Sequence, residues 1–238
     1  CARSTRRLPP SRPKQRPPMS QTLTPPFSYL ITSGATDART TPASAEFKHL
    51  LALVQAAVAA RITFVQLREK RLRPRVLYEL AARAAATTRT SATRLVVNDR
   101  ADIAHAAGAD GVQLTTQSLP ADVVRRAFGP RFLIGVSTHS LTEACAARDA
   151  GADFALFGPV FDTPAKRAYG PPVGLDSLRA AACALAPFPL VAIGGITGAN
   201  MKDALAAGAQ GVAAIRLFTE PHTLAATVRA LHEAHARE

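Results

Sequence analysis

Short apolar segments alternate with longer alanine- and leucine-rich segments along most of this chain, and this alternation constrains the fold more than any other feature. The eight short segments occupy residues 28–32, 62–67, 94–98, 111–114, 132–137, 154–158, 190–195 and 211–215. Each is nearly all apolar, as expected of strands that are buried on both faces of a parallel sheet. The longer segments are predicted helices, and in residues 45–61 the apolar side chains recur close to a helical period.

The same three-residue pattern leads into three of the predicted strands. Gly-Ala-Asp stands at residues 108–110 and 151–153, and Gly-Ala-Gln stands at residues 208–210. In each case the glycine follows a predicted helix, where it suits a left-handed C-terminal cap. One helix–strand unit is therefore used repeatedly.

Eight strands, each followed by a helix, predict an α/β fold with a single (β/α)8 TIM barrel over residues 27–238. The competing architecture is a doubly wound open sheet, which usually carries G-x-G-x-x-G after its first strand. Residues 32–35 are Thr-Ser-Gly-Ala and do not match that motif. The number of strands and the compactness of the chain favour the barrel.

Residues 1–26 are predicted to be a disordered, basic, Pro- and Arg-rich extension. The first 18 residues hold five Arg, one Lys and no acid, which is half of the formal net charge of +12. We interpret them first as an upstream extension that is not part of the translated protein, with Met19 as the start. A transit peptide and a tail that grips nucleic-acid phosphates are the two alternatives. Because the rest of the chain lacks interleaved aromatic residues, we do not expect a nucleic-acid partner.

The three cysteines are few and odd in number, which favours a reducing compartment and predicts a cytoplasmic protein. No uninterrupted apolar stretch reaches about 18–20 residues, so we expect no membrane span. No Cys/His cluster suggests a zinc site. The sequence does not determine the oligomeric state, and a homo-oligomer is compatible with it.

Polar side chains collect after the predicted strands, where TIM barrels carry their active sites. Gln66, Arg68 and Lys70 alternate along an extended segment, so we expect all three to point the same way. Two cations there require an anionic partner, because an unpaired buried charge is costly. An oligophosphate would satisfy them, and an internal pair with Asp99 is the structural alternative.

Two further strand ends suggest ligands for a metal ion and a phosphate. Asn98 and Asp99 offer an amide and a carboxylate, which beside a phosphate suit Mg²⁺, although Asn-Asp is also a common turn. Gly194 and Gly195, with the end of strand 8 at Ile215–Arg216, match the phosphate site found after strands 7 and 8 of many barrels.

His139 is the only histidine at a predicted strand end, just before a Ser-Leu-Thr-Glu capping box at residues 140–143. An imidazole at this rim could move protons, whereas a solvated loop histidine is the structural alternative.

Taken together, the motifs resemble those of the thiamine phosphate synthase / TenI family. They are VQLREK at 65–70, VNDR at 97–100, GVSTHS at 135–140, LFGPVFDTPAK at 156–166 and AIGGIT at 192–197. The resemblance covers about residues 28–220 and implies a (β/α)8 enzyme of thiamine biosynthesis. The synthase joins a pyrimidine diphosphate to a thiazole phosphate with Mg²⁺ and releases pyrophosphate. The TenI branch instead shifts protons on a thiazole carboxylate phosphate to aromatise it.

The resemblance also implies roles for the residues at the strand ends. Gln66, Arg68, Lys70 and Asn98 would contact the pyrimidine diphosphate, and Asp99 would bind the metal. Ser137 and Lys166 would hold the pyrophosphate. Thr163, Gly194, Gly195 and the strand-8 loop with Ile215 and Arg216 would bind the thiazole phosphate. His139 would transfer protons in the tautomerase, with Arg68, Lys70 and Lys166 as the catalytic cations of the synthase.

Departures from the synthase pattern bear on the choice of branch. Gln113 replaces the His of the usual HLGQxD motif, Ser118 replaces its Asp, which is the second metal carboxylate, and Ala165 replaces a loop Thr. A serine hydroxyl is a poor replacement for a carboxylate on a hard dication. These departures favour the thiazole tautomerase, which needs no metal. A Mg²⁺-dependent synthase and a non-catalytic regulator that binds thiazole phosphate are the alternatives.

Overall fold

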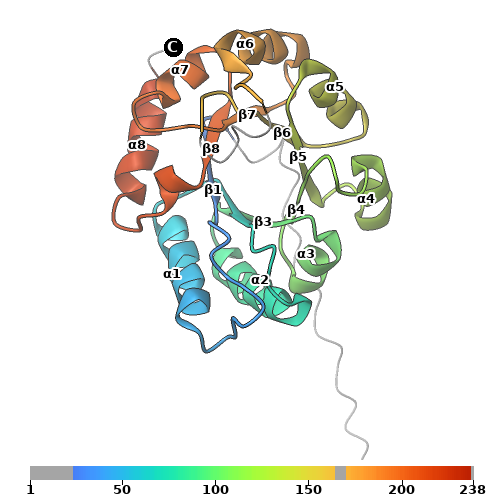
Figure 1. Cartoon of the computed structure of the whole chain (residues 1–238), viewed down its shortest axis with the longest axis vertical. Helices are drawn as coiled ribbons and strands as arrows, with labels where there is room; N and C mark the ends of the chain where they lie inside the picture. Colours follow the sequence, from blue (N-terminus) through green and yellow to red (C-terminus); the bar gives the residue numbers. More distant parts are fainter. Residues whose placement is uncertain (1–23, 164–169, 237–238) are drawn as a thin grey trace, which may run out of the picture.

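The computed structural model describes residues 24–163 and 170–236. Eight parallel strands form a closed barrel in sequence order, and β8 closes the barrel on β1 through the register Phe27↔Gly211. Figure 1 shows the strands in the middle with helices α1 to α8 arranged around them. The strands are β1 Phe27–Ile31, β2 Phe64–Leu67, β3 Arg94–Asn98, β4 Gly111–Leu114, β5 Leu133–Thr138, β6 Phe154–Phe157, β7 Leu190–Ile193 and β8 Gly211–Ala214.

These strands confirm the predicted TIM barrel and exclude the open sheet. The predicted strands at 94–98 and 111–114 agree with β3 and β4, whereas the segment predicted at 190–195 ends earlier, at Ile193. Gly194 and Gly195 follow with φ of 94° and 67°, which no strand can contain. Before β1, residues 24–26 have no regular structure, and residues 1–23 of the predicted extension lie outside the described residues.

The helices follow the alternation that the sequence predicts. They are α1 Ala45–Ala59, α2 Pro74–Thr88, α3 Ala101–Ala107, α4 Ala121–Phe128, α5 Leu141–Asp149, α6 Gly174–Leu185, α7 Met201–Ala206 and α8 Leu224–His235, with a short 3-10 helix η3 Arg216–Phe218 after β8. The α2 helix starts at Pro74, because proline suits the first helical position, where its missing N–H costs nothing. No helix in the described residues is long and apolar enough to cross a membrane.

Apolar side chains fill two separate layers. One layer lies between the barrel and the surrounding helices and contains most of the buried Leu, Val and Ala side chains. The other lies inside the barrel, where the rings of Phe27, Tyr29, Phe64 and Phe154 pack together, with Tyr29 and Phe64 stacked at 5.3 Å between centroids. This inner layer fills the barrel below the C-terminal ends of its strands, which is the end where barrels of this fold carry their active sites.

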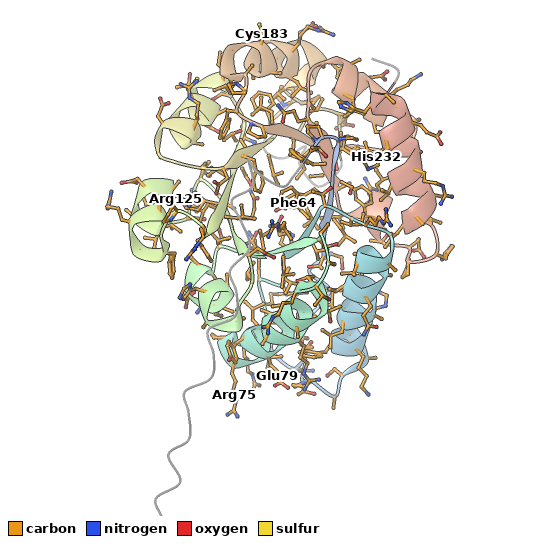
Figure 2. All side chains as sticks on the ribbon, turned by 180° about the vertical axis from the view of Figure 1, so that it is seen from behind. Phe64, Arg75, Glu79, Arg125, Cys183 and His232 are labelled. Atoms are coloured by element: carbon orange, nitrogen blue, oxygen red, sulfur yellow. The ribbon has the colours of Figure 1, made fainter. Side chains whose placement is uncertain are left out.

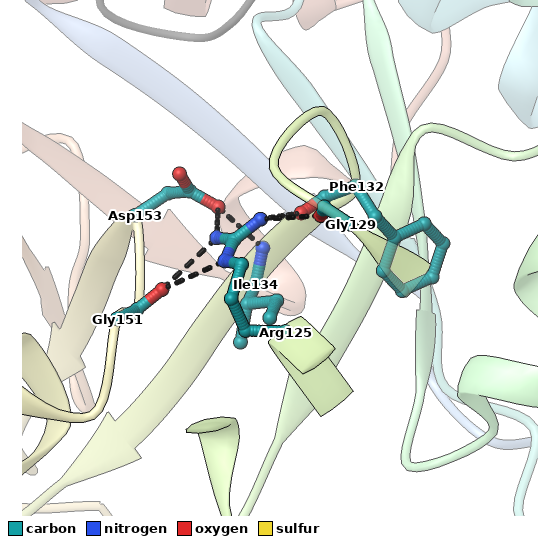
Figure 3. Close-up of polar contacts among 6 residues, drawn as sticks. All are labelled: Arg125, Gly129, Phe132, Ile134, Gly151 and Asp153. Atoms are coloured by element: carbon teal, nitrogen blue, oxygen red, sulfur yellow. Dashed lines mark hydrogen bonds and ion pairs between the residues drawn. The ribbon is translucent and has the colours of Figure 1, made fainter. Parts of the chain in front are cut away.

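Charged side chains at the N-terminal end of the barrel are bound to the strands. Arg125 of α4 donates to Asp153 at 2.7 Å and to the backbone carbonyls of Gly129, Phe132 and Gly151 (Figure 3). Asp153 in turn accepts from the N–H of Ile134 at 2.7 Å. Burial raises the pKa of the Asp153 carboxyl, and the charge of Arg125 opposes that rise. Asp110 repeats this arrangement with the N–H of Leu95 and with Arg94.

Candidate active site

Four polar side chains form the uppermost layer inside the barrel, above the aromatic rings. Gln66 Nε2 donates to Asn98 Oδ1 at 2.9 Å, and Gln113 Nε2 donates to Ser137 Oγ at 3.1 Å. The hydroxyl of Tyr29, from the aromatic layer, donates to Gln113 Oε1 at 3.0 Å. Gln66 is 2% exposed, and its Oε1 has no hydrogen-bond partner among the described residues. A buried acceptor of this kind is costly unless a ligand supplies a donor.

Asp99, directly after β3, holds a carboxylate at the edge of this layer. Its φ of 58° is uncommon for a residue with a Cβ, and such backbone strain is concentrated at functional sites. Asn98 Nδ2 donates to Oδ2 at 2.6 Å, while the hydroxyls of Ser118 and Thr115 donate to Oδ1. No ion pair joins Asp99 to Arg68 or Lys70 in the part of the chain that is described, so the internal pair considered above does not form.

The Asp99 cluster fits a Mg²⁺ ion that draws most of its ligands from substrate and water. Among the described residues no group of three His, Cys, Asp or Glu side chains could hold a metal. Mg²⁺ needs only one or two carboxylates when phosphate oxygens complete its shell. Asp99 supplies one carboxylate, and the hydroxyl oxygens of Thr115 and Ser118 lie beside it. Ser118 therefore joins the cluster through its hydroxyl group.

The segment after β2 brings Arg68 and Lys70 to the same end of the barrel. The strand ends at Leu67 and a turn begins at Lys70, so their shared direction is not imposed by strand alternation as predicted. Arg68 is half-buried, its N–H donates to Thr32 Oγ1 at 2.8 Å, and its guanidinium passes close to Gly34. Lys70 is exposed. Both cations lie within the rim without an acidic ion-pair partner among the described residues.

Glu69, between these cations, is a residue of the candidate site that sequence reasoning missed. Its side chain is 2% exposed and accepts from the N–H of Gly34 at 3.1 Å and from the N–H and hydroxyl of Thr36. The carboxylate thus holds the β1–α1 loop against the segment that carries Arg68 and Lys70. The position of an acid between two cations was visible in the sequence, but its inward direction was not.

His139 lies after β5 and is held at two atoms. Its ring Nδ1 contacts the carbonyl oxygen of Gly158, and its backbone N–H donates to Glu143 Oε2 at 2.7 Å. Because a carbonyl can only accept, Nδ1 carries the hydrogen and Nε2 keeps its lone pair in the neutral ring. Ser140 caps α5 as predicted, whereas Glu143 returns to the N–H of His139 instead of the N–H of Ser140.

The loop after β7 is folded tightly against the loop after β6. A Cβ on Gly194 would lie 2.4 Å from the Cα of Pro159, and a Cβ on Gly195 would lie 2.6 Å from the carbonyl oxygen of Asp162. Only glycine fits at these positions, which brings the backbone to the rim as expected of a phosphate site. Asn200, which sequence reasoning missed, bridges this loop to α7 by donating to the Gly195 carbonyl and accepting from the N–H of Thr197.

The remaining predicted residues lie around the same rim or outside the described residues. Ile215 packs on the inner apolar layer, and Arg216 is exposed at the start of η3. Thr163 is half-buried at the last described position of the β6 loop. Lys166 and Ala165 lie outside the described residues. The structure therefore brings the described candidates to one end of the barrel.

These features define a (β/α)8 barrel whose C-terminal strand ends carry two cations, a carboxylate and a tight glycine loop. The chain belongs to the thiamine phosphate synthase / TenI family: the family model described as thiamine monophosphate synthase matches residues 32–218. A Moorella thermoacetica thiamine-phosphate synthase is 41% identical over 187 residues, which is 79% of this chain and 89% of that protein. A Geobacter sulfurreducens protein whose name also refers to thiamine-phosphate synthase is 51% identical over 168 residues, 71% of this chain and 78% of that one.

A solved structure agrees with these sequence relatives. Thiamine phosphate pyrophosphorylase from Pyrococcus furiosus superposes with a TM-score of 0.72 at 29% identity, covering 87% of this chain and 96% of that chain. All three similar proteins carry synthase or pyrophosphorylase names. They favour the synthase, so the preference for the tautomerase drawn from Gln113 and Ser118 is not supported.

Proposed function

We propose that this protein is a Mg²⁺-dependent thiamine-phosphate synthase. It would couple hydroxymethylpyrimidine diphosphate to thiazole phosphate and release pyrophosphate. The synthase relatives support this assignment, and the observation that carries it in the structure is the unpartnered Oε1 of Gln66. An aminopyrimidine presents N–H donors, so its amino group would satisfy this buried acceptor. Asn98, whose Oδ1 already accepts from Gln66, fixes the amide in the required orientation.

The cations of the rim would bind the diphosphate end of this substrate. Arg68 offers a forked contact and Lys70 a point charge, and Lys166 is proposed to join them. Gln113 donates to Ser137 Oγ and to the Leu114 carbonyl, so the Ser137 hydroxyl keeps its own proton for a phosphate oxygen. Mg²⁺, held by Asp99, would neutralise the charge that develops on the departing pyrophosphate.

The reaction would then be a dissociative substitution. The bond between the pyrimidine methylene carbon and the diphosphate oxygen breaks, and its electron pair leaves with pyrophosphate. The thiazole nitrogen supplies the electron pair of the new C–N bond. Arg68, Lys70 and Lys166 stabilise the leaving group in place, which lowers the barrier without a proton transfer. The thiazole phosphate would lie against Thr163, Gly194, Gly195 and the loop at Ile215–Arg216.

His139 supports a second candidate function. Its hydrogen-bonded Nδ1 leaves Nε2 available as a base, which is the state that a thiazole tautomerase requires. In that reaction Nε2 would remove one ring proton and return a proton elsewhere, with no metal.

The test is an end-point assay with the full chain, both substrates and Mg²⁺, with thiamine phosphate measured as a fluorescent oxidation product. We expect turnover, and Gln66→Ala should lower kcat/KM for the pyrimidine diphosphate by about 100-fold. Arg126→Gln, on the outer face of α4, is the matched control and should leave activity unchanged.

Three outcomes separate the functions. Thiamine phosphate formed at a catalytic rate establishes the synthase. The protein is a tautomerase if no thiamine phosphate forms and the thiazole carboxylate phosphate is aromatised in a reaction that His139→Ala abolishes. The protein is a non-catalytic regulator if it binds thiazole phosphate and catalyses neither reaction. Cytoplasmic localisation stays a prediction throughout.

A further inference from the structure

Four cations lie within six residues between the end of β2 and the first turn of α2. They are Lys70, Arg71, Arg73 and Arg75, and all four are exposed. Figure 2 shows Arg75 pointing away from the barrel. Together with the exposed Arg39 of the β1–α1 loop, these residues are called the α2 basic surface. The reaction proposed above uses Lys70 alone among them.

Asp37 of the β1–α1 loop is an exposed acid whose pKa is affected by cations of this surface. The N–H of Arg39 donates to Asp37 Oδ1 at 2.7 Å, and this hydrogen bond lowers the pKa of the Asp37 carboxyl. The positive charges of Arg39 and Arg71 also lower that pKa. The Asp37 carboxylate therefore offsets part of the positive charge of the α2 basic surface.

The two acids nearest in sequence to the cations at 70–75 do not neutralise them. Glu69 is turned inward and is bonded to Gly34 and Thr36. Glu79, one turn beyond Arg75, pairs with Arg83. Within the described residues, no acid forms an ion pair with Lys70, Arg73 or Arg75.

The start of α2 is also an unfavourable place for cations. Of the eight described α-helices, six carry an acid in their first turn, as the positive end of a helix dipole favours. The α2 helix has no acid there and instead has Arg73 at its N-cap and Arg75 in its first turn. The helix dipole and the side chains therefore add their positive potentials at one place on the rim.

We propose that the α2 basic surface is a capture site that attracts the diphosphate end of a small anionic substrate and delivers it to Arg68. This inference rests on the proposed function, because it assumes a diphosphate substrate. The surface continues directly from Arg68 along the chain, at the C-terminal end of the barrel where the candidate site lies. A concentrated positive field at such an entrance raises the association rate of anions and is screened by salt.

The test compares two triple variants with the same change in net charge. Arg71→Gln/Arg73→Gln/Arg75→Gln removes three charges from the α2 basic surface and leaves Lys70 in place. Lys48→Gln/Arg131→Gln/Arg229→Gln removes three exposed charges from elsewhere and is the control. Steady-state kinetics are measured for the pyrimidine diphosphate at increasing ionic strength. The affinity of the full-length proteins for magnesium pyrophosphate is measured by calorimetry.

At low salt we expect the α2 variant to lose about 5- to 10-fold in kcat/KM with kcat unchanged, and the control to lose less than about 2-fold. Raising the ionic strength to about 0.5 M should remove the difference. Equal losses in the two variants, or a loss that persists at high salt, would overturn the proposal.

The measurement of pyrophosphate affinity tests the capture site independently of the proposed function. If the protein makes no thiamine phosphate, the proposed function fails, but the two variants still differ in pyrophosphate affinity when the capture site is real. If turnover is found and both variants bind pyrophosphate as the natural chain does, at low and high salt, the capture site alone is refuted.

Discussion

The two ends of the barrel differ in how their charged and polar groups are satisfied. At the N-terminal end, Arg125 and Asp153 bind each other and the backbone of neighbouring strands. At the C-terminal end, within the described residues, the buried Oε1 of Gln66 has no hydrogen-bond partner and Arg68 has no acidic ion-pair partner. Groups that only stabilise a fold gain most from internal partners, whereas groups that bind a ligand must leave bonds open for it. This difference indicates that the C-terminal end carries the candidate site, whereas the charged groups at the N-terminal end stabilise the fold.

The largest effect on stability is expected at the N-terminal end. Arg125→Met removes the side-chain donors to Asp153 and to three backbone carbonyls and leaves a largely buried carboxylate. We expect a loss of about 2–3 kcal/mol in the free energy of unfolding, because removing one partner leaves the other charge uncompensated. Urea unfolding measures it. The activity of the folded variant at 25 °C should stay within about 2-fold of that of the natural protein. A loss of activity without a loss of stability would contradict a purely structural role for the N-terminal end of the barrel.

The cost of Arg125→Met should depend on pH. Burial raises the pKa of Asp153, and Arg125 opposes the rise, so removing Arg125 raises that pKa further. The folded variant then takes up a proton at a pH where the unfolded chain does not, which stabilises it as the pH falls. The difference from the natural protein should be largest near pH 7 and shrink towards the unfolded pKa of about 3.9. Unfolding curves from pH 7 to pH 4 test this sign, and a difference that grows in acid would refute it.

An effect on ligand binding is expected from Gly195→Ala. The new Cβ would meet the Asp162 carbonyl oxygen at 2.6 Å, at a φ of 67°. We expect about 1–2 kcal/mol of strain, relieved by displacement of the loop, and weaker binding of thiazole phosphate. Gly198→Ala is the matched control, since no atom lies near a Cβ there. Calorimetry with thiazole phosphate checks the pair, and equal affinities would remove this loop from the phosphate site.

A smaller gain is expected from Ser118→Asp at the metal cluster. Asp99 would receive a second carboxylate beside it in place of the Ser118 hydroxyl. Because Mg²⁺ prefers carboxylates to hydroxyls, the affinity for Mg²⁺ with pyrophosphate present should rise, by about 3- to 10-fold. Titration of Mn²⁺ by electron paramagnetic resonance measures it directly, and Ser118→Asn keeps the size without the charge. A gain with the Asn variant, or none with Asp, would place the metal elsewhere.

The smallest effect is expected on the outer surface. Arg126 and Asp122 form an exposed pair one turn apart on α4, with side chains 69% and 46% exposed. Asp122→Ser should change the free energy of unfolding by less than about 0.5 kcal/mol, since solvent screens such pairs. Urea unfolding measures this variant too. A loss of unfolding free energy as large as that of Arg125→Met would show that solvent exposure does not explain the difference between the two ion pairs.

The barrel could be predicted from the sequence because its determinants are local. The apolar segments at 94–98 and 111–114 became strands with the predicted bounds, and the glycines before β4, β6 and β8 adopt positive φ as predicted. The strand ends also located the candidate site, since Gln66, Asn98 and Ser137 lie in one layer. The preference for the tautomerase, drawn from Gln113, Ser118 and Ala165, is not supported by the similar proteins. The sequence did not show that the Ser118 hydroxyl donates to Asp99.

Sequence by itself determined where the strands lie, to within about two residues, and which polar residues follow them, because hydrophobic periodicity and glycine conformations act within a few residues. Tertiary structure decided which groups have partners. Tyr29 reaches Gln113 across 84 positions of the chain, Glu69 turns inward to Gly34, and Gln66 Oε1 is left open. Those outcomes depend on barrel closure, which sets segments distant in sequence side by side and decides which donors and acceptors lie within hydrogen-bond reach.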